Sequence, residues 1–405
     1  MTRPDAPAPL RRRGPRPLLL HLTLAMLKST ASVAASQTSS AASRSWAAPG
    51  AADAAAALRG ALPPSSEAFP AAVLREALRQ DRDLIAGVAA YRRHPWRRDL
   101  ADPPALWSEG ESRLLDYGGA GPTVLFVPSL VNRAYVLDLA PGRSLMRFMA
   151  GSGVRALLLD WGWPGEVERG FTLTDYIAGR LERALVHAAA GGPVILAGYC
   201  MGGLLALAAA ARRPELVRGL ALLATPWDFH AGDAERAQAL AGLGPMLEPM
   251  FAVSGTLPVD AIQMLFAMLD PWGIAAKYRG FARLDPAGAR AEMFVALEDW
   301  LNDGVPLAAP VARECLSGWY GRNEPARGAW RIAGLPVAPE AVATPAFVAV
   351  PSRDRIVPPE SARPLAGRLP RAVLHVPGAG HIGMAAGSTA EAALWRPLLG
   401  WIGGV

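Results

Sequence analysis

The feature that most constrains the fold is a series of short, wholly apolar runs separated by longer amphipathic stretches. Strands that are apolar on both faces belong in a parallel sheet covered by helices on both sides. Two of the intervening stretches, Tyr176–Ala190 and Met201–Ala211, have the length and spacing of crossover helices. The sequence therefore predicts an α/β fold with a mostly parallel sheet. The predicted strands are Val124–Pro128, Ala156–Asp160, Val194–Gly198, Gly219–Thr225, Ala346–Pro351 and Ala372–Val376.

This alternation lapses between the fourth and fifth predicted strands. Helical spacing there covers Ala234–Leu243, Val259–Leu269 and Ala291–Leu301, which predicts an inserted helical cap at about residues 228–344. Large apolar side chains of the cap either line an acyl pocket or form the cap's own core, and both interpretations stay open. They are Met246, Met250, Phe251, Met264, Phe266, Met268 and Met293.

The basic charge of the chain is confined to its start. The whole chain has 41 Lys and Arg against 35 Asp and Glu, and residues 1–45 hold seven basic residues and one Asp, so the remainder is neutral. A neutral body argues against nucleic-acid binding. We expect residues 1–66, which are basic and rich in Ala, Ser and Pro, to form a mobile tail and linker. Residues 67–120 are expected to be a helical extension, and residues 121–405 the α/β domain with its cap.

An apolar run, Pro17–Leu27, follows three arginines near the start of the chain. Arginines, an apolar run and then small residues are the order of a secretory signal. Lys28 ends the run after about eleven residues, whereas a membrane-spanning helix needs about 20. We favour a cytoplasmic protein with a basic extension over an exported one, with weak adhesion to an acidic or lipid surface as a variant.

The two cysteines and six histidines do not indicate a metal or a disulfide framework. Cys200 and Cys315 stand far apart, without the Cys-x-x-Cys spacing of metal and redox sites, and no histidines pair at helical spacing. We therefore expect no metal. We also expect no organic cofactor, because the catalytic groups described next suffice for the chemistry.

The motif with the strongest chemical content is Gly198-Tyr199-Cys200-Met201-Gly202-Gly203, between a predicted strand and a predicted helix. This Gly-x-Cys-x-Gly pattern is a nucleophile elbow with Cys in place of Ser, which indicates an α/β-hydrolase fold. A cysteine at a helix N-terminus is favoured as a thiolate. The next amide, that of Met201, is placed to stabilise an oxyanion.

A nucleophile of this kind needs a base and an orienting acid. Asp354 follows the fifth predicted strand and His381 follows the sixth, in the chain order that this fold uses. Asp228, which also follows a strand, is the rival acid. We expect His375 and Cys315 to be structural. For the second oxyanion donor we predict the backbone amide of Val131, in the loop after the first predicted strand.

These segments resemble the poly(3-hydroxyalkanoate) synthase family, the polymerases of bacterial storage polyesters. The resemblance begins at about Leu115 and continues to the C-terminus. Besides the elbow and Gly380-His381-Ile382-Gly383, it rests on Val131-Asn132-Arg133 with Tyr135, Leu159-Asp160-Trp161-Gly162-Trp163-Pro164, Leu173-Thr174-Asp175-Tyr176-Ile177, Ala224-Thr225-Pro226-Trp227-Asp228-Phe229 and Trp300-Leu301-Asn302-Asp303.

The resemblance implies that Cys200 carries the acyl group, that His381 is the base and that Asp354 supports it. The implied substrates are 3-hydroxyacyl-CoA and the growing polyester chain. Asp160-Trp161-Gly162 is most similar to the shorter, two-subunit class, which implies a second synthase subunit; a homodimer is the alternative. The family usually has His after the catalytic Asp, and Arg355 stands there instead. Contact with a polymer granule surface is a further expectation.

The leading hypothesis is a polyhydroxyalkanoate synthase-like acyltransferase that releases CoA from 3-hydroxyacyl-CoA. The alternative is a hydrolase of thioesters or polyesters with the same Cys-His-Asp triad, which differs only in that water attacks the acyl-enzyme. A third hypothesis is a non-enzymatic granule or interaction protein on the same scaffold, which requires an unreactive Cys200.

Overall fold

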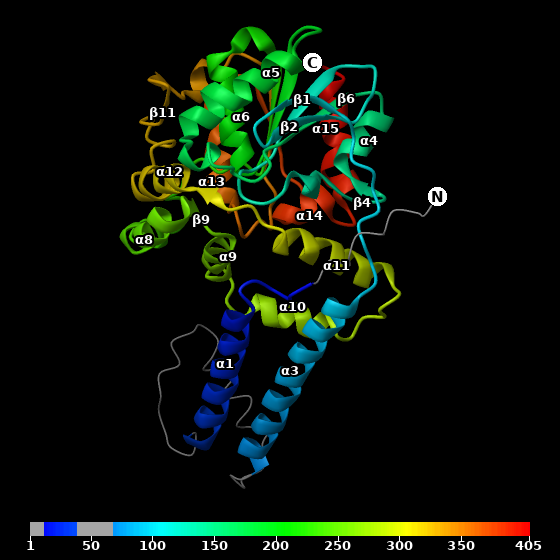
Figure 1. The fold of residues 1–405 in the computed structure, drawn as a ribbon, viewed down its shortest axis with the longest axis vertical. Helices are drawn as coiled ribbons and strands as arrows, with labels where there is room; N and C mark the ends of the chain where they lie inside the picture. The colour runs from blue at the N-terminus through cyan, green and yellow to red at the C-terminus, as the bar shows by residue number, and fades with distance from the viewer. Residues whose placement is uncertain (1–11, 39–67) are drawn as a thin grey trace. The chain divides into compact units, whose positions relative to one another are not determined.

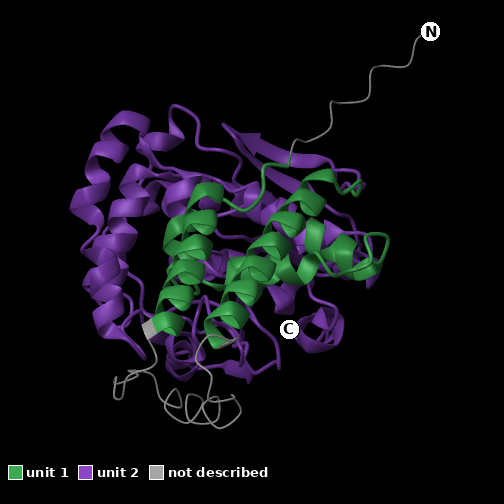
Figure 2. Cartoon of the chain, turned by 90° about the horizontal axis from the view of Figure 1, so that it is seen from below, with its two compact units in different colours: residues 1–96, 263–295 green, residues 97–262, 296–405 purple. Residues whose placement is uncertain are grey.

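A computed structural model of the chain describes residues 12–38 and 68–405. The chain divides into two compact units. The larger unit comprises residues 97–262 and 296–405, and the smaller comprises residues 1–96 and 263–295 (Figure 2).

The larger unit is built on an eight-stranded sheet. Strand β2 is antiparallel to both its neighbours, and each adjacent pair from β6 to β14 is parallel. All six strands predicted from apolar runs are present, and the α/β-hydrolase prediction is confirmed. In order across the sheet the strands are β1 (Ala105–Glu109), β2 (Ser112–Asp116), β6 (Arg155–Asp160), β3 (Thr123–Val127), β7 (Val194–Tyr199), β8 (Val217–Leu223), β13 (Ala346–Ala349) and β14 (Ala372–His375).

Helices cover both faces of this sheet, with α5 and α6 on one side and α4 and α15 on the other (Figure 1). Helix α6 is buried from Met201 to Ala210, since its Ala and Leu side chains pack on β7 and β8. The predicted crossover helices are thus confirmed. The flanking helices are α4 (Leu145–Gly151), η3 (Asp175–Leu181), α5 (Glu182–Ala188), α6 (Met201–Arg212), α13 (Pro359–Arg368), α14 (His381–Ala386), η7 (Glu391–Trp395) and α15 (Arg396–Ile402).

The segment between β8 and β13 is helical, as expected for a cap, but its middle belongs to the other unit. Residues 263–295 group with the N-terminal helices rather than with the sheet. The segment's helices are α7 (Ala234–Ala241), α8 (Gly244–Ser254), α9 (Val259–Ala267), α10 (Gly273–Phe281), α11 (Ala289–Asn302), α12 (Ala309–Arg313) and η5 (Glu314–Gly321). Short strands pair beside them: β9 (Thr256–Leu257) with β10 (Leu307–Ala308), and β11 (Arg331–Ile332) with β12 (Leu335–Pro336).

The apolar stripe of the cap is only partly a core. Phe251 is 2% exposed, whereas Met246 is 74% exposed and Met268 55% exposed. Met250 and Met264 are exposed as well. The interpretation that the stripe simply fills the cap's interior therefore fails for these four methionines.

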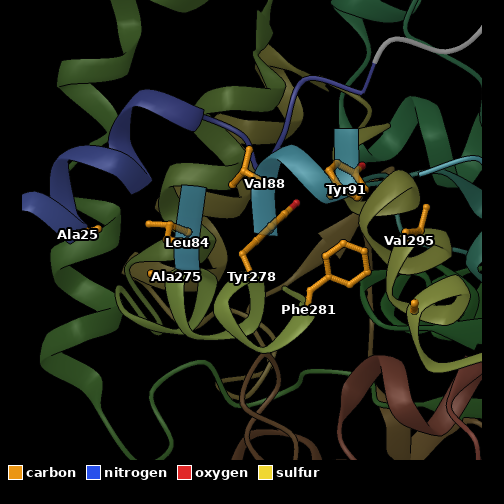
Figure 3. Packing of buried hydrophobic residues seen from close by; sticks show 9 residues of the cluster. Ala25, Leu84, Val88, Tyr91, Ala275, Tyr278, Phe281 and Val295 are labelled. Carbon is orange, nitrogen blue, oxygen red and sulfur yellow. The ribbon is translucent and has the colours of Figure 1, made fainter. Parts of the chain in front are cut away.

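The smaller unit has a core of its own, made by α1 (Leu18–Thr38), α3 (Ala68–Arg93), α10 and residues up to 295 (Figure 3). The rings of Tyr91 and Tyr278 meet edge to face at 5.7 Å, and those of Phe281 and Phe294 stack at 4.3 Å. Ser29 Oγ donates to Asp81 Oδ1 at 2.9 Å and joins α1 to α3. The buried residues are Ala25, Leu84, Val88, Tyr91, Ala275, Tyr278, Phe281, Ala291 and Val295.

The N-terminal region differs from the expected tail and helical extension. Within residues 1–66, the described part forms helix α1, which continues past Lys28 because Ala- and Ser-rich sequence follows and one face packs on α3. The rest of the expected tail, residues 1–11 and 39–66, lies outside the described residues. Within residues 67–120, α3 is helical as expected, but β1 and β2 form a hairpin at the sheet edge. Strand β1 is largely exposed and carries no apolar run, so the sequence pattern did not reveal it.

Among the described residues, one helix is long and apolar enough to cross a membrane by length and composition, namely Leu18–Gln37. Only 11% of that segment is buried, and a signal sequence near an N-terminus passes the same test. The expectation that Lys28 makes the apolar segment too short is therefore not supported.

Close packing of α3 on α10 gives a test of the smaller unit. A Cβ at Gly87 would lie 2.0 Å from the backbone oxygen of Tyr278. We expect Gly87→Ala to destabilise the protein by about 1–3 kcal/mol, because two helix backbones would have to separate. The matched control is Gly280→Ala on α10, where a Cβ meets nothing within 4 Å and should cost nothing. Urea unfolding followed by circular dichroism measures both; equal midpoints for the two variants would contradict this packing.

Candidate active site

Cys200 occupies a strained turn between β7 and α6. Its φ of 57° and ψ of −130° lie in a region that residues with a Cβ rarely adopt. The Cys200 amide donates to Leu223 O at 2.8 Å, which fixes the turn to the next strand. The side chain is half-buried at the first turn of α6, as the elbow motif predicts.

The glycines of the motif are required because backbone atoms, or for Gly203 the side chain of Thr225, lie where a Cβ would stand. A Cβ at Gly198 would lie 2.4 Å from Gly203 Cα, and one at Gly202 would lie 2.1 Å from Val127 O. A Cβ at Gly203 would lie 1.8 Å from Thr225 Oγ1. These contacts let α6 start directly against β7, β8 and the end of β3, which holds the turn at Cys200 in its strained form.

Asp354 and His381 come together from the loops after β13 and β14. His381 Nδ1 and Asp354 Oδ2 are 2.6 Å apart, and both side chains are buried. Asp354 Oδ1 accepts from the amides of Ile356 and Val357 at 2.8 and 2.9 Å, so both carboxylate oxygens are fixed. Cys200 lies close enough to His381 for the two side chains to interact electrostatically. The three residues singled out from the sequence therefore form one connected constellation, and their catalytic roles stay predictions.

Two backbone hydrogen bonds tie the acid loop to the base loop. The Ser352 amide donates to Pro377 O and the Arg353 amide to Ala379 O, each at 3.0 Å. Because the parallel pairing of β13 with β14 continues into these bonds, the loops leave the sheet together. This explains how two residues 27 positions apart reach hydrogen-bond distance.

The electrostatics of the constellation favour a proton on His381. Burial lowers the pKa of this imidazole, but the negative charge of Cys200 and the bond to Asp354 outweigh it and raise the pKa to about 10. At neutral pH the arrangement thus favours the protonated form of His381. By linkage, the stabilisation that the raised pKa of His381 gives the folded state is complete below about 6.5, the pKa of a free imidazole, and is lost as pH rises through about 10.

The other candidates have structural partners. Asp228 Oδ1 accepts from Asn323 Nδ2 at 2.8 Å and from the His230 amide at 3.0 Å, whereas the carboxylate bonded to His381 is that of Asp354. His375 Nε2 lies 2.6 Å from the backbone oxygen of Ala393. Cys315 is buried, and burial raises the pKa of its thiol.

The two expected oxyanion donors have different surroundings. Met201 is the first residue of α6, where helix amides face outward from the N-terminus. The Val131 amide instead donates to Ser129 Oγ at 3.0 Å within its own loop. To serve an oxyanion it would have to leave that bond, so the geometry gives Val131 less support than Met201.

Two tryptophans of the family-like segments hold the loop after β3, a role that their sequence pattern did not indicate. Trp161 Nε1 donates to Pro128 O at 3.0 Å, and Trp300 Nε1 donates to Arg133 O at 2.8 Å. Between these anchors Asn132 has a φ of 89°. The loop that approaches the first turn of α6 is therefore clamped at both ends by indole N–H groups.

The described residues include no group of three or more His, Cys, Asp or Glu side chains that could hold a metal ion. Fold and site together define an α/β-hydrolase-fold protein with a Cys–His–Asp constellation. A family model described as the alpha/beta hydrolase fold matches residues 122–244.

The chain belongs to the poly(3-hydroxyalkanoate) polymerase family. It is 30% identical over 273 residues to the poly(3-hydroxyalkanoate) polymerase subunit PhaC of Synechocystis, a match that covers 64% of this chain and 72% of the relative. The subunit of the same name from Haloferax mediterranei is 31% identical over 310 residues, which cover 73% of this chain and 62% of the relative's length. That from Allochromatium vinosum is 28% identical, with 69% and 80% covered. The relatives are polymerases, so membership places the chain in a family of enzymes.

Solved structures are less similar to the chain. An epoxide hydrolase of Bacillus megaterium superposes on 75% of this chain and 100% of its own, with a TM-score of 0.49 and 13% identity.

The raised pKa of His381 can be tested by titration. Because Cys200 and Asp354 both raise it, we expect Cys200→Ser and Asp354→Asn each to lower the pKa of His381 from about 10 toward or below 6.5, since burial then acts with less opposition. NMR of protein labelled at histidine Cε1 measures this, with the signal assigned by its loss in His381→Gln. His375→Gln is the matched control and should leave the titration unchanged. A His381 pKa that is the same in both variants as in the wild type would contradict the influence of Cys200 and Asp354 on this imidazole.

Proposed function

We propose that the chain polymerises 3-hydroxyacyl groups taken from 3-hydroxyacyl-CoA, with Cys200 as the acyl carrier. The observation that supports this most is the buried His381–Asp354 hydrogen bond beside Cys200 at a strained elbow, in a chain related to polymerases. Cysteine suits the reaction because transfer from CoA exchanges one thioester for another and loses little free energy. The acyl group then stays reactive enough for attack by an alcohol.

In the first step the Cys200 thiolate attacks the carbonyl carbon of the CoA thioester. The Met201 amide, at the N-terminus of α6, donates to the oxygen on which negative charge develops. When the tetrahedral intermediate collapses, the bond to the CoA sulfur breaks, and His381 gives its proton to the leaving thiolate. The products are free CoA and an acyl thioester on Cys200.

In the second step the hydroxyl group at the end of another 3-hydroxyacyl unit attacks the thioester on Cys200. His381, now neutral, takes the hydroxyl proton, and Asp354 stabilises the imidazolium through the bond to Nδ1. An ester bond forms, the Cys200 thioester breaks, and the thiolate–imidazolium pair is restored. Each cycle thus adds one ester bond and releases one CoA. If water replaces the hydroxyl, the same steps hydrolyse the thioester, which is the competing function.

The relatives are named as subunits, and we extend that to this chain as part of the proposal: it acts together with a second protein chain, either a different synthase subunit or a copy of itself. No resident cofactor takes part in the proposed cycle, since the triad and the backbone amide supply all its proton and charge transfers.

The polymerase proposal is tested by CoA release from 3-hydroxybutyryl-CoA with analysis of the product. We expect wild type to release CoA and to form polymer or oligomer, and Cys200→Ala to lose at least about a thousandfold in rate, because no thioester can form. Cys315→Ala is the matched control and should retain activity, since that thiol is buried and stays protonated.

The product decides between the two chemistries. Cys200-dependent release that yields only free 3-hydroxybutyrate would identify a hydrolase. Release that is equally fast in Cys200→Ala would contradict the acyl-carrier role. If the chain alone is inactive, the same assay with longer acyl-CoAs and with a partner subunit from a relative tests the two-chain arrangement.

We place the protein in the cytoplasm at the surface of its polymer. Support comes from α1, which has no acidic residue and exposes Leu19 (77%), Met26 (66%) and Leu27 (59%). Such an apolar face gains free energy when it leaves water for a hydrophobic surface.

This placement predicts that changing Leu19, Met26 and Leu27 together to Gln releases the protein from poly(3-hydroxybutyrate) particles. Co-sedimentation measures the bound fraction. The control is Leu335→Gln, an exposed leucine of the larger unit, which should leave binding unchanged. Binding that survives the triple change would contradict a role for α1.

A further inference from the structure

We propose that Tyr199 is a positioning residue for His381: its hydroxyl and its ring hold the base against the nucleophile. This inference rests on the proposed function, since it concerns the same Cys200–His381 pair. Tyr199 is the last residue of β7 and directly precedes the nucleophile. Its side chain is buried, with 4% of the residue exposed.

Two contacts join Tyr199 to the base. Its hydroxyl donates to the backbone oxygen of His381 at 3.2 Å, and its ring centroid lies 5.1 Å from that of the imidazole, with the planes tilted by 39°. One contact therefore fixes the backbone of His381 and the other limits how its side chain can rotate. Asp354 adds the third restraint through Nδ1. His381 is thus restrained at its backbone oxygen, at the face of its ring and at Nδ1.

The hydroxyl of Tyr199 remains a donor throughout the working pH range. Burial, and after it the negative charges of Cys200 and Asp354, hold the pKa of Tyr199 well above its ordinary value. The only acceptor that the structure gives this O–H in the described residues is the His381 carbonyl. An aromatic face near a cation also stabilises it electrostatically, which favours the imidazolium form of His381.

The position of Tyr199 in the chain explains why this arrangement is effective. Residues 199 and 200 share one peptide bond, whereas His381 reaches the site through a separate loop. A side chain at the end of β7, directly before Cys200, therefore fixes the position of His381 relative to the nucleophile. Small shifts of the two bonded loops would otherwise change the distance between Cys200 and His381.

The test separates the hydroxyl from the ring and needs no substrate. In Tyr199→Phe the ring stays and the hydrogen bond is lost; in Tyr199→Leu both are lost. Iodoacetamide alkylates Cys200 when the thiolate attacks its CH₂ carbon and iodide leaves, so the rate against pH reports on the thiolate–imidazolium pair. Cys315→Ala is used as background, so that Cys200 is the sole cysteine.

We expect Tyr199→Phe to lower the alkylation rate at neutral pH by about 3- to 10-fold, the effect of one hydrogen bond in a buried site. We expect Tyr199→Leu to lower the alkylation rate further. We also expect this variant to lower the pKa of His381, which NMR titration measures. The charged and titratable groups that act on His381 are Cys200 and Asp354, which both variants retain. Where turnover is measurable, kcat should fall with KM within about twofold.

Tyr117→Phe is the matched control, because it also removes a tyrosine hydrogen bond, here from a half-buried residue to Asp138 Oδ2 at 3.1 Å, at a position distant in the sequence from the three site residues. Its alkylation profile should equal that of the background. If Tyr199→Phe and Tyr199→Leu both keep the background profile and titration, the inference is overturned. Altered alkylation in a protein that releases no CoA would uphold the positioning role while the proposed polymerase activity fails.

Discussion

The strained backbone at Cys200 is the constraint on which the rest of the site depends. A residue with a Cβ is held at φ 57° only because strand, helix and neighbouring loop meet there without side chains between them. Gly198, Gly202 and Gly203 allow this close approach because they have no Cβ. The cost of the turn is offset by the burial of α6 and the parallel strands behind it. As a result the sulfur and the first amides of α6 face the same space.

The base and the acid reach that space by a different route. Neighbouring parallel strands end at the same edge of a sheet, and the loops after β13 and β14 stay bonded to each other beyond the strands. Both carboxylate oxygens of Asp354 are hydrogen-bonded, Oδ1 to two backbone amides and Oδ2 to His381. The carboxylate therefore holds the imidazole in one orientation. The negative groups on either side of that ring explain why its pKa rises despite burial.

The loop after β3 illustrates how distant segments support one site. Its start is held by Trp161 from the end of β6 and its finish by Trp300 from α11. Both tryptophans lie in segments that resemble the polymerase family. Their hydrogen bonds to the loop after β3 give each of them a structural role. The smaller unit is different in kind: a helical core around Tyr91 and Tyr278 with an exposed apolar face on α1.

The sequence alone determined the six parallel strands of the sheet, its crossover helices, the elbow and the order of the chemical residues, because local apolar runs and glycine spacing report directly on buried strands and tight turns. It did not reveal β1, an exposed edge strand without an apolar run, or β2, in which only Leu114 and Leu115 are apolar. Nor did it reveal helix α1, which packs on α3. Asp228 and Asp354 both follow strands, and only the tertiary structure decided which carboxylate meets His381. The contact of Tyr199 with His381, across 182 positions, was likewise invisible in the sequence, since hydrogen bonds between distant loops leave no local pattern.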